Sequence, residues 1–213
     1  MKNLDLSLYL VLDPDLCASF GLVATALAAV AGGATVVQLR DKRAATDQII
    51  ETGRALKMAL SGTGARLIIN DDVEGALAVG ADGVHVGQDD MDVRLARARI
   101  GPDMVLGLSV ETQALAEAVD PTIVDYAGIG PVFATPTKTD HKQPIGFHGL
   151  ACLITRCPVP SVAIGGLKAD HVREVFAAGA KGIAVVSAIC GSADPEAASR
   201  EISSNIRSVG VNQ

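Results

Sequence analysis

Short apolar runs and longer amphipathic stretches alternate from one end of the chain to the other. The apolar runs are rich in β-branched residues, and runs of this kind predict buried β-strands. We expect strands near residues 9–12, 35–39, 67–69, 83–86, 105–108, 126–129, 162–164 and 182–186. The stretches between them are Ala-rich, with apolar positions at helical spacing, which predicts a helix after each strand.

Strands that alternate with helices form parallel βαβ units, so the predicted fold class is α/β. About eight such units in 213 residues predict a single (β/α)8 TIM barrel, with a doubly wound open sheet as the alternative. A weak repeat fits both folds, because glycines in residues 31–34, 79–83 and 178–182 are typical of a helix end before an apolar strand. No linker-like or low-complexity segment interrupts the chain, and we expect residues 1–213 to form one catalytic barrel domain.

The composition narrows the range of partners. Hydrophobic residues make up 49% of the chain but aromatic residues only 3%, and the net charge is −6, which argues against a nucleic-acid surface. No apolar run reaches the roughly 18 residues of a membrane span, and the start of the chain, with Asp5, is unlike a signal peptide. We therefore expect a cytoplasmic protein that binds neither nucleic acid nor membranes. The sequence leaves a homo-oligomer open.

Polar residues gather where the predicted strands end. In a (β/α)8 barrel the carboxyl ends of the strands and the loops after them form the active site, so these residues are the candidates. In chain order they are Asp13; Gln38, Arg40 and Lys42; Asn70, Asp71 and Asp72; Gln88, Asp89 and Asp90; Ser109; Thr135, Pro136, Thr137 and Lys138; Gly165 and Gly166; and Ser187. The set brings cations, carboxylates, hydroxyls and a glycine pair to one face of the barrel.

Two carboxylate pairs follow neighbouring strands of the predicted barrel. Asp71 and Asp72 follow the third strand, and Asp89 and Asp90 follow the fourth, so an acid from each pair can share a hard cation. Mg2+ prefers one or two carboxylates together with water and phosphate oxygens. The alternative is that these acids cap the helices that follow, a role that suits Asp and Asn. We favour the metal site, in which one acid of each pair can still be a cap.

Cations follow the second predicted strand. Gln38, Arg40 and Lys42 alternate along an extended segment, so their side chains point the same way. Arg offers phosphate a planar fork and Lys offers a point charge. Salt bridges to Asp41 or to the other carboxylates are the alternative, although a metal with a polyphosphate would use cations and acids together.

Two later segments are candidate anion sites. The polar loop 135–144 supplies hydroxyls and backbone N–H groups that suit a second anionic group, and a solvated connector is the alternative. The pairs Gly165-Gly166 and Val186-Ser187 follow the seventh and eighth strands, where many such barrels bind a phosphate on backbone amides. Glycine also ends strands for steric reasons, so the first pair has a structural alternative.

Other chemically distinctive residues are expected to be structural. His85 lies in mid-strand, where a core or supporting role is favoured over catalysis. The charged residues of segment 91–100, among them Arg97, lie off its apolar stripe and predict a solvated helix surface. The four cysteines have neither zinc-site spacing nor the density of a disulfide framework, so we expect reduced structural thiols.

Eight short motifs follow one another along nearly the whole chain. They are Val37-Gln38-Leu39-Arg40-Asp41-Lys42, Ile69-Asn70-Asp71-Asp72, Gly83-Val84-His85-Val86-Gly87-Gln88-Asp89-Asp90, Gly107-Leu108-Ser109, Gly128-Ile129-Gly130-Pro131-Val132-Phe133, Thr135-Pro136-Thr137-Lys138, Ala163-Ile164-Gly165-Gly166 and Val185-Val186-Ser187-Ala188-Ile189. Each motif is weak alone, but together and in this order they are specific. The chain resembles the thiamine-phosphate synthase family, whose members are also called thiamine-phosphate pyrophosphorylases.

The resemblance implies a (β/α)8 barrel that joins 4-amino-5-hydroxymethyl-2-methylpyrimidine diphosphate to hydroxyethylthiazole phosphate, giving thiamine phosphate and pyrophosphate. By the same resemblance, the pyrimidine diphosphate is held by Gln38, Leu39, Arg40, Asp41, Lys42, Asn70, Ser109 and Lys138. Asp71 and Asp90 are implied to carry Mg2+. The thiazole phosphate is implied to be held by Thr135, Pro136, Thr137, Gly166, Val186 and Ser187.

The chemistry that the resemblance implies fits these side chains. In this family the C–O bond is thought to break first, leaving a pyrimidine-stabilised cation that the thiazole nitrogen captures, so no strong base is needed. The resemblance assigns catalytic roles to Arg40, Lys42, Ser109 and Lys138, with the cations and Mg2+ stabilising the departing pyrophosphate. We expect Asp90→Ala and Lys138→Ala to lose coupling activity and keep the fold.

Three alternatives stay open at this point. A thiazole tautomerase resembles the same barrel but has no need of a metal site with a pyrophosphate clamp. A phosphosugar epimerase or isomerase requires an acid and a base across a carbon centre, and no such pair can be assigned. A non-catalytic phosphate-binding barrel predicts ligand binding without Mg2+-dependent release of pyrophosphate.

Overall fold

The computed structural model describes residues 4–135 and 143–210, and this part of the chain folds into a closed barrel of eight parallel strands. The strands follow one another around the barrel in chain order, and the last pairs with the first. They are β1 (Leu8–Leu12), β2 (Val36–Leu39), β3 (Arg66–Asn70), β4 (Gly83–Val86), β5 (Val105–Val110), β6 (Tyr126–Ile129), β7 (Ser161–Ile164) and β8 (Gly182–Val185). The predicted (β/α)8 barrel is confirmed, and the doubly wound sheet is wrong.

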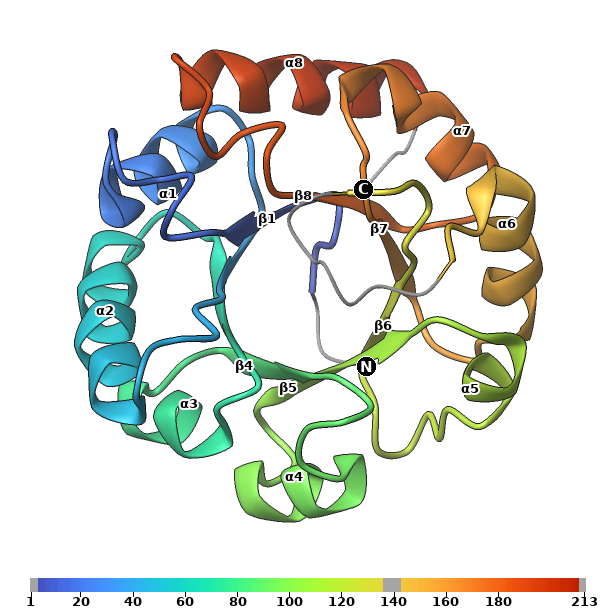
Figure 1. Cartoon of the computed structure of the whole chain (residues 1–213), viewed down its shortest axis with the longest axis horizontal. Helices are drawn as coiled ribbons and strands as arrows, with labels where there is room; N and C mark the ends of the chain where they lie inside the picture. Colours follow the sequence, from blue (N-terminus) through green and yellow to red (C-terminus); the bar gives the residue numbers. More distant parts are fainter. Residues whose placement is uncertain (1–3, 136–142, 211–213) are drawn as a thin grey trace.

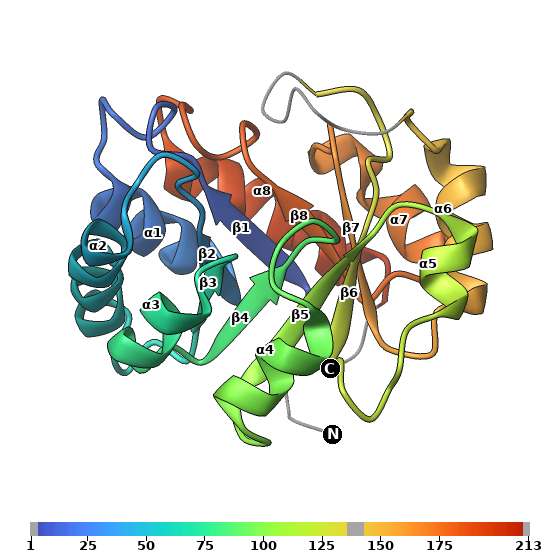
Figure 2. The ribbon, with the colours of Figure 1, turned by 60° about the horizontal axis from the view of Figure 1, so that its bottom comes forward.

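Helices form a ring outside the strands (Figure 1). They are α1 (Leu22–Ala31), α2 (Thr46–Ala59), α3 (Val73–Val79), α4 (Val93–Ile100), α5 (Gln113–Glu117), α6 (Gly146–Arg156), α7 (Val172–Ala177) and α8 (Pro195–Ser208), with a short 3-10 turn, η1 (Ala169–His171), before α7. Figure 2 shows the helices packed along the outside of the tilted strands. Among the described residues, no helix is both long and apolar enough to cross a membrane.

Each strand is buried on two faces, which explains the nearly continuous apolar runs. In β1, Leu8, Leu10 and Leu12 belong to the outer core between strands and helices. Tyr9 and Val11 belong to a separate cluster inside the barrel. Because side chains alternate along a strand, the same alternation in the other strands decides which residues reach the barrel interior.

Glycines have two uses in the repeated junctions between helix and strand. Gly80 ends α3 with φ 66°, in the left-handed region that favours glycine. Gly83 and Gly182 then open β4 and β8. A Cβ at Gly83 would lie 2.6 Å from the carbonyl oxygen of Val105, and one at Gly182 would overlap the carbonyl oxygen of Leu6. The repeat therefore marks both a helix end and a tightly packed strand entry.

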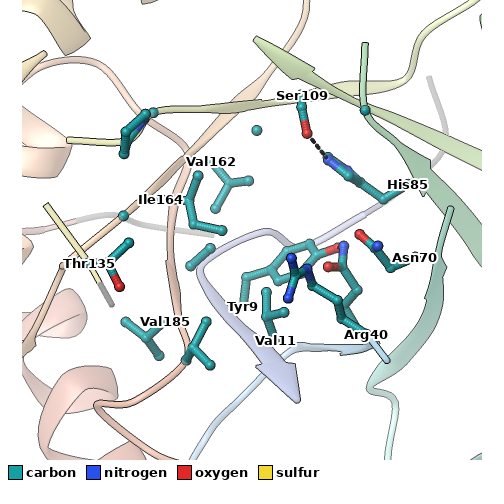
Figure 3. Close-up of a pocket in the computed structure, with 18 of the residues that line it drawn as sticks. Tyr9, Val11, Arg40, Asn70, His85, Ser109, Thr135, Val162, Ile164 and Val185 are labelled. Carbon is teal, nitrogen blue, oxygen red and sulfur yellow. Dashed lines mark hydrogen bonds between the residues drawn. The ribbon is translucent and has the colours of Figure 1, made fainter. Parts of the chain in front are cut away.

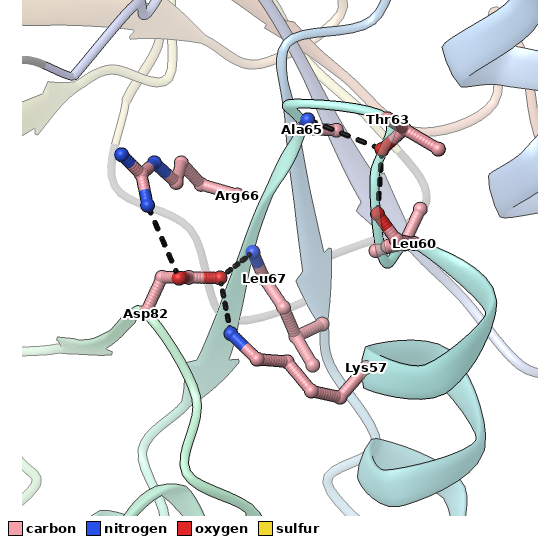
Figure 4. Close-up of polar contacts among 7 residues, drawn as sticks. All are labelled: Lys57, Leu60, Thr63, Ala65, Arg66, Leu67 and Asp82. Carbon is pink, nitrogen blue, oxygen red and sulfur yellow. Dashed lines mark hydrogen bonds and ion pairs between the residues drawn. The ribbon is translucent and has the colours of Figure 1, made fainter.

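A carboxylate ties neighbouring strands together at the amino end of the barrel (Figure 4). Asp82 precedes β4 and accepts a hydrogen bond of 2.9 Å from the backbone N–H of Leu67 in β3. The same carboxylate forms ion pairs with Lys57 at 2.9 Å and Arg66 at 3.4 Å. These contacts lie at the end of the strands opposite to the predicted site, so their role is structural.

Arg97 on α4 corrects the prediction of a solvated helix surface. Its side chain is only 17% exposed and pairs with Asp125 at 2.6 Å, whose carboxylate also accepts the N–H of Leu106. The guanidinium further donates to the carbonyl oxygens of Gly101, Met104 and Ile123. The apolar stripe of α4 could not reveal this, because Ile123 and Asp125 lie 26 and 28 residues from Arg97 in sequence. The neighbouring Arg94 is exposed, as predicted.

Candidate functional site

The carboxyl ends of the strands surround a pocket at the mouth of the barrel, and every strand or the loop after it contributes a lining residue. The predicted site residues that line it are Gln38, Arg40, Lys42, Asn70, Asp71, Asp90, Ser109, Thr135, Gly166, Val186 and Ser187. Figure 3 shows Arg40, Asn70 and His85 on one side of the pocket, with Thr135 and Val185 across from them. The structure thus brings together residues that are distant in sequence.

Leu39 and Asp41, which the resemblance places on the pyrimidine diphosphate, do not line this pocket, and neither do the candidates Asp72, Gln88 and Asp89. Leu39 is buried in the outer core, because its side chain points to the opposite side of β2 from that of Gln38. Asp41 accepts hydrogen bonds from the backbone N–H groups of Arg43 and Ala44, so it stabilises its own turn. The side chain of Leu39 therefore cannot contact a ligand in this pocket. The predicted residues Pro136, Thr137 and Lys138 lie outside the described residues.

The two proposed metal-binding carboxylates meet beside a lysine. Asp71 and Asp90 lie close enough to change each other's pKa, and Oδ2 of Asp71 lies 3.5 Å from Nζ of Lys42. Burial, together with the carboxylate of Asp90, raises the pKa of Asp71 to about 6. Burial alone would also raise the pKa of Asp90, but the interaction with Asp71 and the N–H of Gly87 lower it instead. The two carboxylates thus repel each other unless a positive charge lies near them, and Lys42 supplies one.

The neighbouring acids have different roles. Asp72 is the N-cap of α3 and accepts a hydrogen bond of 2.7 Å from the N–H of Gly75, as the capping alternative predicted. Asp71 takes φ 63°, an uncommon conformation for a residue with a side chain, immediately after β3. Asp89 is exposed and does not line the pocket. One acid of each pair thus faces the pocket.

The glycine pair after β7 packs against the loop after β6. Gly165 and Gly166 have φ values of 104° and 64°, and the carbonyl of Gly165 accepts the N–H of Phe133 at 3.0 Å. A Cβ at Gly166 would lie 2.8 Å from Cβ of Phe133. Phe133 in turn packs edge-on against Phe147, with ring centroids 5.1 Å apart. Both positions require glycine for the packing of the loop. The absence of a side chain there would also let a ligand approach the backbone.

Two tyrosines are pocket residues that the sequence analysis missed. Tyr9 and Tyr126 are 2% and 1% exposed, and their hydroxyls lie 2.8 Å apart inside the barrel. His85 points inward as well and hydrogen-bonds Tyr126 and Ser109, which confirms a supporting position in the core. Both tyrosines lie within predicted strands, but alternation alone does not say which face of a strand is the inner one.

The pocket offers two regions with different chemistry. One region holds the cations Arg40 and Lys42, the amide of Asn70 and the carboxylate pair, a combination suited to a polyphosphate with a divalent cation. The opposite region holds the Thr135 hydroxyl and the backbone around Gly166 and Ser187, which suits a single phosphate. The side chains of Val162 and Ile164, from β7, lie between the two regions (Figure 3).

Comparisons with known proteins identify close relatives. Residues 8–189 match the family model described as thiamine monophosphate synthase. The thiamine-phosphate synthase of Xanthobacter autotrophicus is 51% identical over 201 residues, which cover 94% of this chain and 95% of the relative. That of Laribacter hongkongensis is 48% identical over 202 residues, covering 94% and 95%.

Solved structures agree with these sequence relatives. A thiamine phosphate pyrophosphorylase from Pyrococcus furiosus superimposes with a TM-score of 0.88 at 35% identity, covering 97% of this chain and 98% of that one. A 3-hexulose-6-phosphate synthase superimposes with a TM-score of 0.64 at 19% identity, covering 94% and 99%. The second similarity concerns the fold alone.

Proposed function

The chain belongs to the thiamine monophosphate synthase family, and from this premise we propose that it joins 4-amino-5-hydroxymethyl-2-methylpyrimidine diphosphate to hydroxyethylthiazole phosphate. The products are thiamine phosphate and pyrophosphate. Family membership makes the chain an enzyme of the transferase class in thiamine biosynthesis. The observation that carries the specific reaction is the meeting of Arg40, Lys42 and the Asp71–Asp90 pair at one side of a pocket whose other side suits a second phosphate.

In this proposal each substrate occupies one region of the pocket. The diphosphate lies with Arg40, Lys42 and Asn70, and its pyrimidine ring extends toward Gln38 and Ser109. The thiazole phosphate lies with Thr135, Gly166, Val186 and Ser187 across the pocket. Lys138 keeps its proposed role on the diphosphate, although it lies outside the described residues.

The donor set fits Mg2+. Two carboxylates and the oxygens of a bound diphosphate form the kind of ligand set that Mg2+ prefers, with water completing it. Among the described residues there is no cluster of three or more His, Cys, Asp or Glu that could hold a metal ion. Asp71 and Asp90 would hold the ion, and when bound it would neutralise charge on the leaving pyrophosphate.

The side chains support a reaction that begins with departure of pyrophosphate. Arg40 and Lys42 offset the negative charge that develops on the leaving group as the C–O bond breaks. The pyrimidine-stabilised cation is then captured by the thiazole nitrogen, which needs no strong base. The apolar walls from Val162, Ile164 and Val185 keep water away from the cation before capture.

Pyrophosphate release tests the proposal directly. The protein is supplied with both substrates, with each substrate alone, and with both substrates after removal of divalent cations. We expect pyrophosphate and thiamine phosphate in equal amounts only when both substrates and Mg2+ are present. Binding of the phosphorylated ligands without any pyrophosphate would favour the non-catalytic barrel, and turnover of a thiazole phosphate alone would favour the tautomerase.

A further inference from the structure

Five polar side chains form a continuous hydrogen-bonded path through the barrel interior. Gln38 Nε2 donates to the Tyr9 hydroxyl at 2.8 Å, and that hydroxyl lies 2.8 Å from the hydroxyl of Tyr126. The Tyr126 hydroxyl lies 3.0 Å from His85 Nδ1, and His85 Nε2 lies 3.0 Å from Ser109 Oγ. The path joins β2, β1, β6, β4 and β5, and both of its ends line the pocket.

The strands leave space for this path. The strand register places Gly107 between His85 on β4 and Tyr126 on β6. A Cβ at Gly107 would overlap the Tyr126 ring and Nδ1 of His85, and one at Gly128 would lie 3.2 Å from Cε1 of His85. Two inward-facing glycines thus allow the rings to reach hydrogen-bonding distance, so the path is a built feature of the barrel.

The protons along the path can be ordered from one end. Burial raises the pKa of both tyrosines above the usual value, so each hydroxyl keeps its proton. Tyr9 accepts from Gln38, and Tyr126 is the only other hydrogen-bond partner of its buried hydroxyl among the described residues, so the Tyr9 proton goes to Tyr126. Tyr126 accepts from Tyr9 and donates to Nδ1 of His85, which leaves the histidine proton on Nε2. His85 then donates to Ser109 Oγ, and the Ser109 proton points to another acceptor.

We infer that Tyr9, Tyr126 and His85 are positioning residues that fix the hydrogen-bond polarity of the pocket. They orient the Gln38 amide so that its nitrogen is engaged and its Oε1 accepts from a ligand, and they leave Ser109 as a donor to a ligand. A ring that carries an exocyclic amine and an unprotonated ring nitrogen matches this polarity, whereas its oxo counterpart carries C=O and N–H in their place. The inference rests on the proposed function for its ligand, an aminopyrimidine diphosphate.

The proton order is tested without any ligand. Nitrogen NMR of 15N-labelled protein distinguishes the two neutral tautomers of His85 by the chemical shifts of the ring nitrogens. We expect the proton on Nε2 and an unprotonated Nδ1. A proton on Nδ1 would reverse the path and overturn the inference.

The consequence for recognition is tested with Tyr126→Phe, which removes one hydroxyl and keeps the ring. Calorimetry compares the affinities for the 4-amino pyrimidine diphosphate, its 4-oxo analogue and inorganic pyrophosphate. We expect the preference for the amino compound to fall about tenfold, the scale of one buried hydrogen bond, with the affinity for pyrophosphate unchanged. Tyr9→Phe, which releases the Gln38 amide, should act in the same direction.

Ser161→Ala is the matched control. It removes a buried hydroxyl of β7 that bonds only to the nearby backbone oxygen of Val159 among the contacts in the structure, outside the path. An equal loss of preference in this variant, or an unchanged preference in Tyr126→Phe, would overturn the positioning role. Failure of the wild-type protein to bind either pyrimidine diphosphate would defeat the proposed function, whereas the NMR result decides the proton order independently.

Discussion

Nζ of Lys42 lies 3.5 Å from Oδ2 of Asp71, at the place where the loop after β2 meets the end of β3. The lysine side chain is about half exposed, so the ion pair itself contributes little stability. Its position matters more, because it places a half-exposed cation beside two carboxylates and within the lining of the pocket, where an anionic ligand can contact it. A polyphosphate with a divalent cation can replace both partners of the pair.

Lys42→Gln is therefore expected to impair catalysis far more than folding. Loss of one cation from a leaving-group site should lower kcat/KM for the pyrimidine diphosphate by on the order of 10²-fold. The matched control is Arg43→Gln, since Arg43 pairs with Asp15 at 2.6 Å and does not line the pocket. Steady-state kinetics with both substrates measures the effect. Similar losses in the two variants would mean that the general charge of this loop matters, rather than Lys42.

Asp90→Asn is expected to weaken the response to Mg2+. In the wild type, the Asp90 carboxylate accepts a hydrogen bond of 2.7 Å from the N–H of Gly87. The amide oxygen of Asn can accept the same bond, so the loop should keep its shape. The Mg2+ concentration for half-maximal rate should rise by at least the roughly 10- to 100-fold that follows loss of a partner supporting a metal ligand. Asp89→Asn, which changes the exposed neighbour, should leave the Mg2+ response as in the wild type. An identical Mg2+ response in Asp90→Asn would remove this residue from the metal site.

Asp82 gives the fold a predictable dependence on pH. Burial would raise its pKa, but the N–H of Leu67 and the ion pairs with Lys57 and Arg66 together lower it below the usual range. The pKa of Asp82 in the folded protein is thus lower than the unfolded value near 3.9. Its contribution to the free energy of unfolding is therefore fully present above the unfolded pKa and is lost as the pH falls through the folded pKa. Asp82→Asn should cost about 1 kcal/mol at neutral pH, since the amide keeps an acceptor but loses the charge.

The pH series distinguishes this ionisation from a general loss of packing. Urea unfolding of the wild type and Asp82→Asn is compared between about pH 7 and pH 3, and the difference in free energy should shrink toward the acid end. Asp103→Asn, at an exposed site before β5, is the control and should match the wild type throughout. A difference that stays constant with pH would show that the charge of Asp82 contributes nothing.

The strands could be predicted from the sequence because a strand that is buried on both faces is a short, nearly continuous run of apolar residues. All eight predicted strands occur, and the differences lie at their ends: β3 reaches Asn70 and β5 reaches Val110, so Asn70 and Ser109 lie within strands. The alternation of Gln38, Arg40 and Lys42 was sufficient to place all three on the pocket side. Their roles in binding stay predictions, as does the metal-binding role of Asp71 and Asp90.

The polar path inside the barrel could not be predicted in the same way. Tyr9 and Tyr126 are 117 residues apart, and their contact depends on closure of the barrel and on the glycine at position 107. Local alternation shows that Leu8 and Tyr9 point in opposite directions, but the closed sheet decides which of them faces inward. Leu39 is a different case: the family motif includes it, but alternation with Gln38 places its side chain on the opposite face of β2, in the outer core.

Arg97 gives the clearest test of a buried charge in this fold. Its guanidinium donates to three carbonyl oxygens and to the carboxylate of Asp125, so Arg97→Met would remove these hydrogen bonds and the ion pair with a half-buried acid. Urea unfolding should show a loss of about 3 kcal/mol or more. Arg94→Met on the same helix is the control: its side chain is 69% exposed and pairs with Asp120 at 3.3 Å, so the loss should stay below about 1 kcal/mol. Equal losses would show that the contacts of Arg97 add nothing beyond those of an exposed pair.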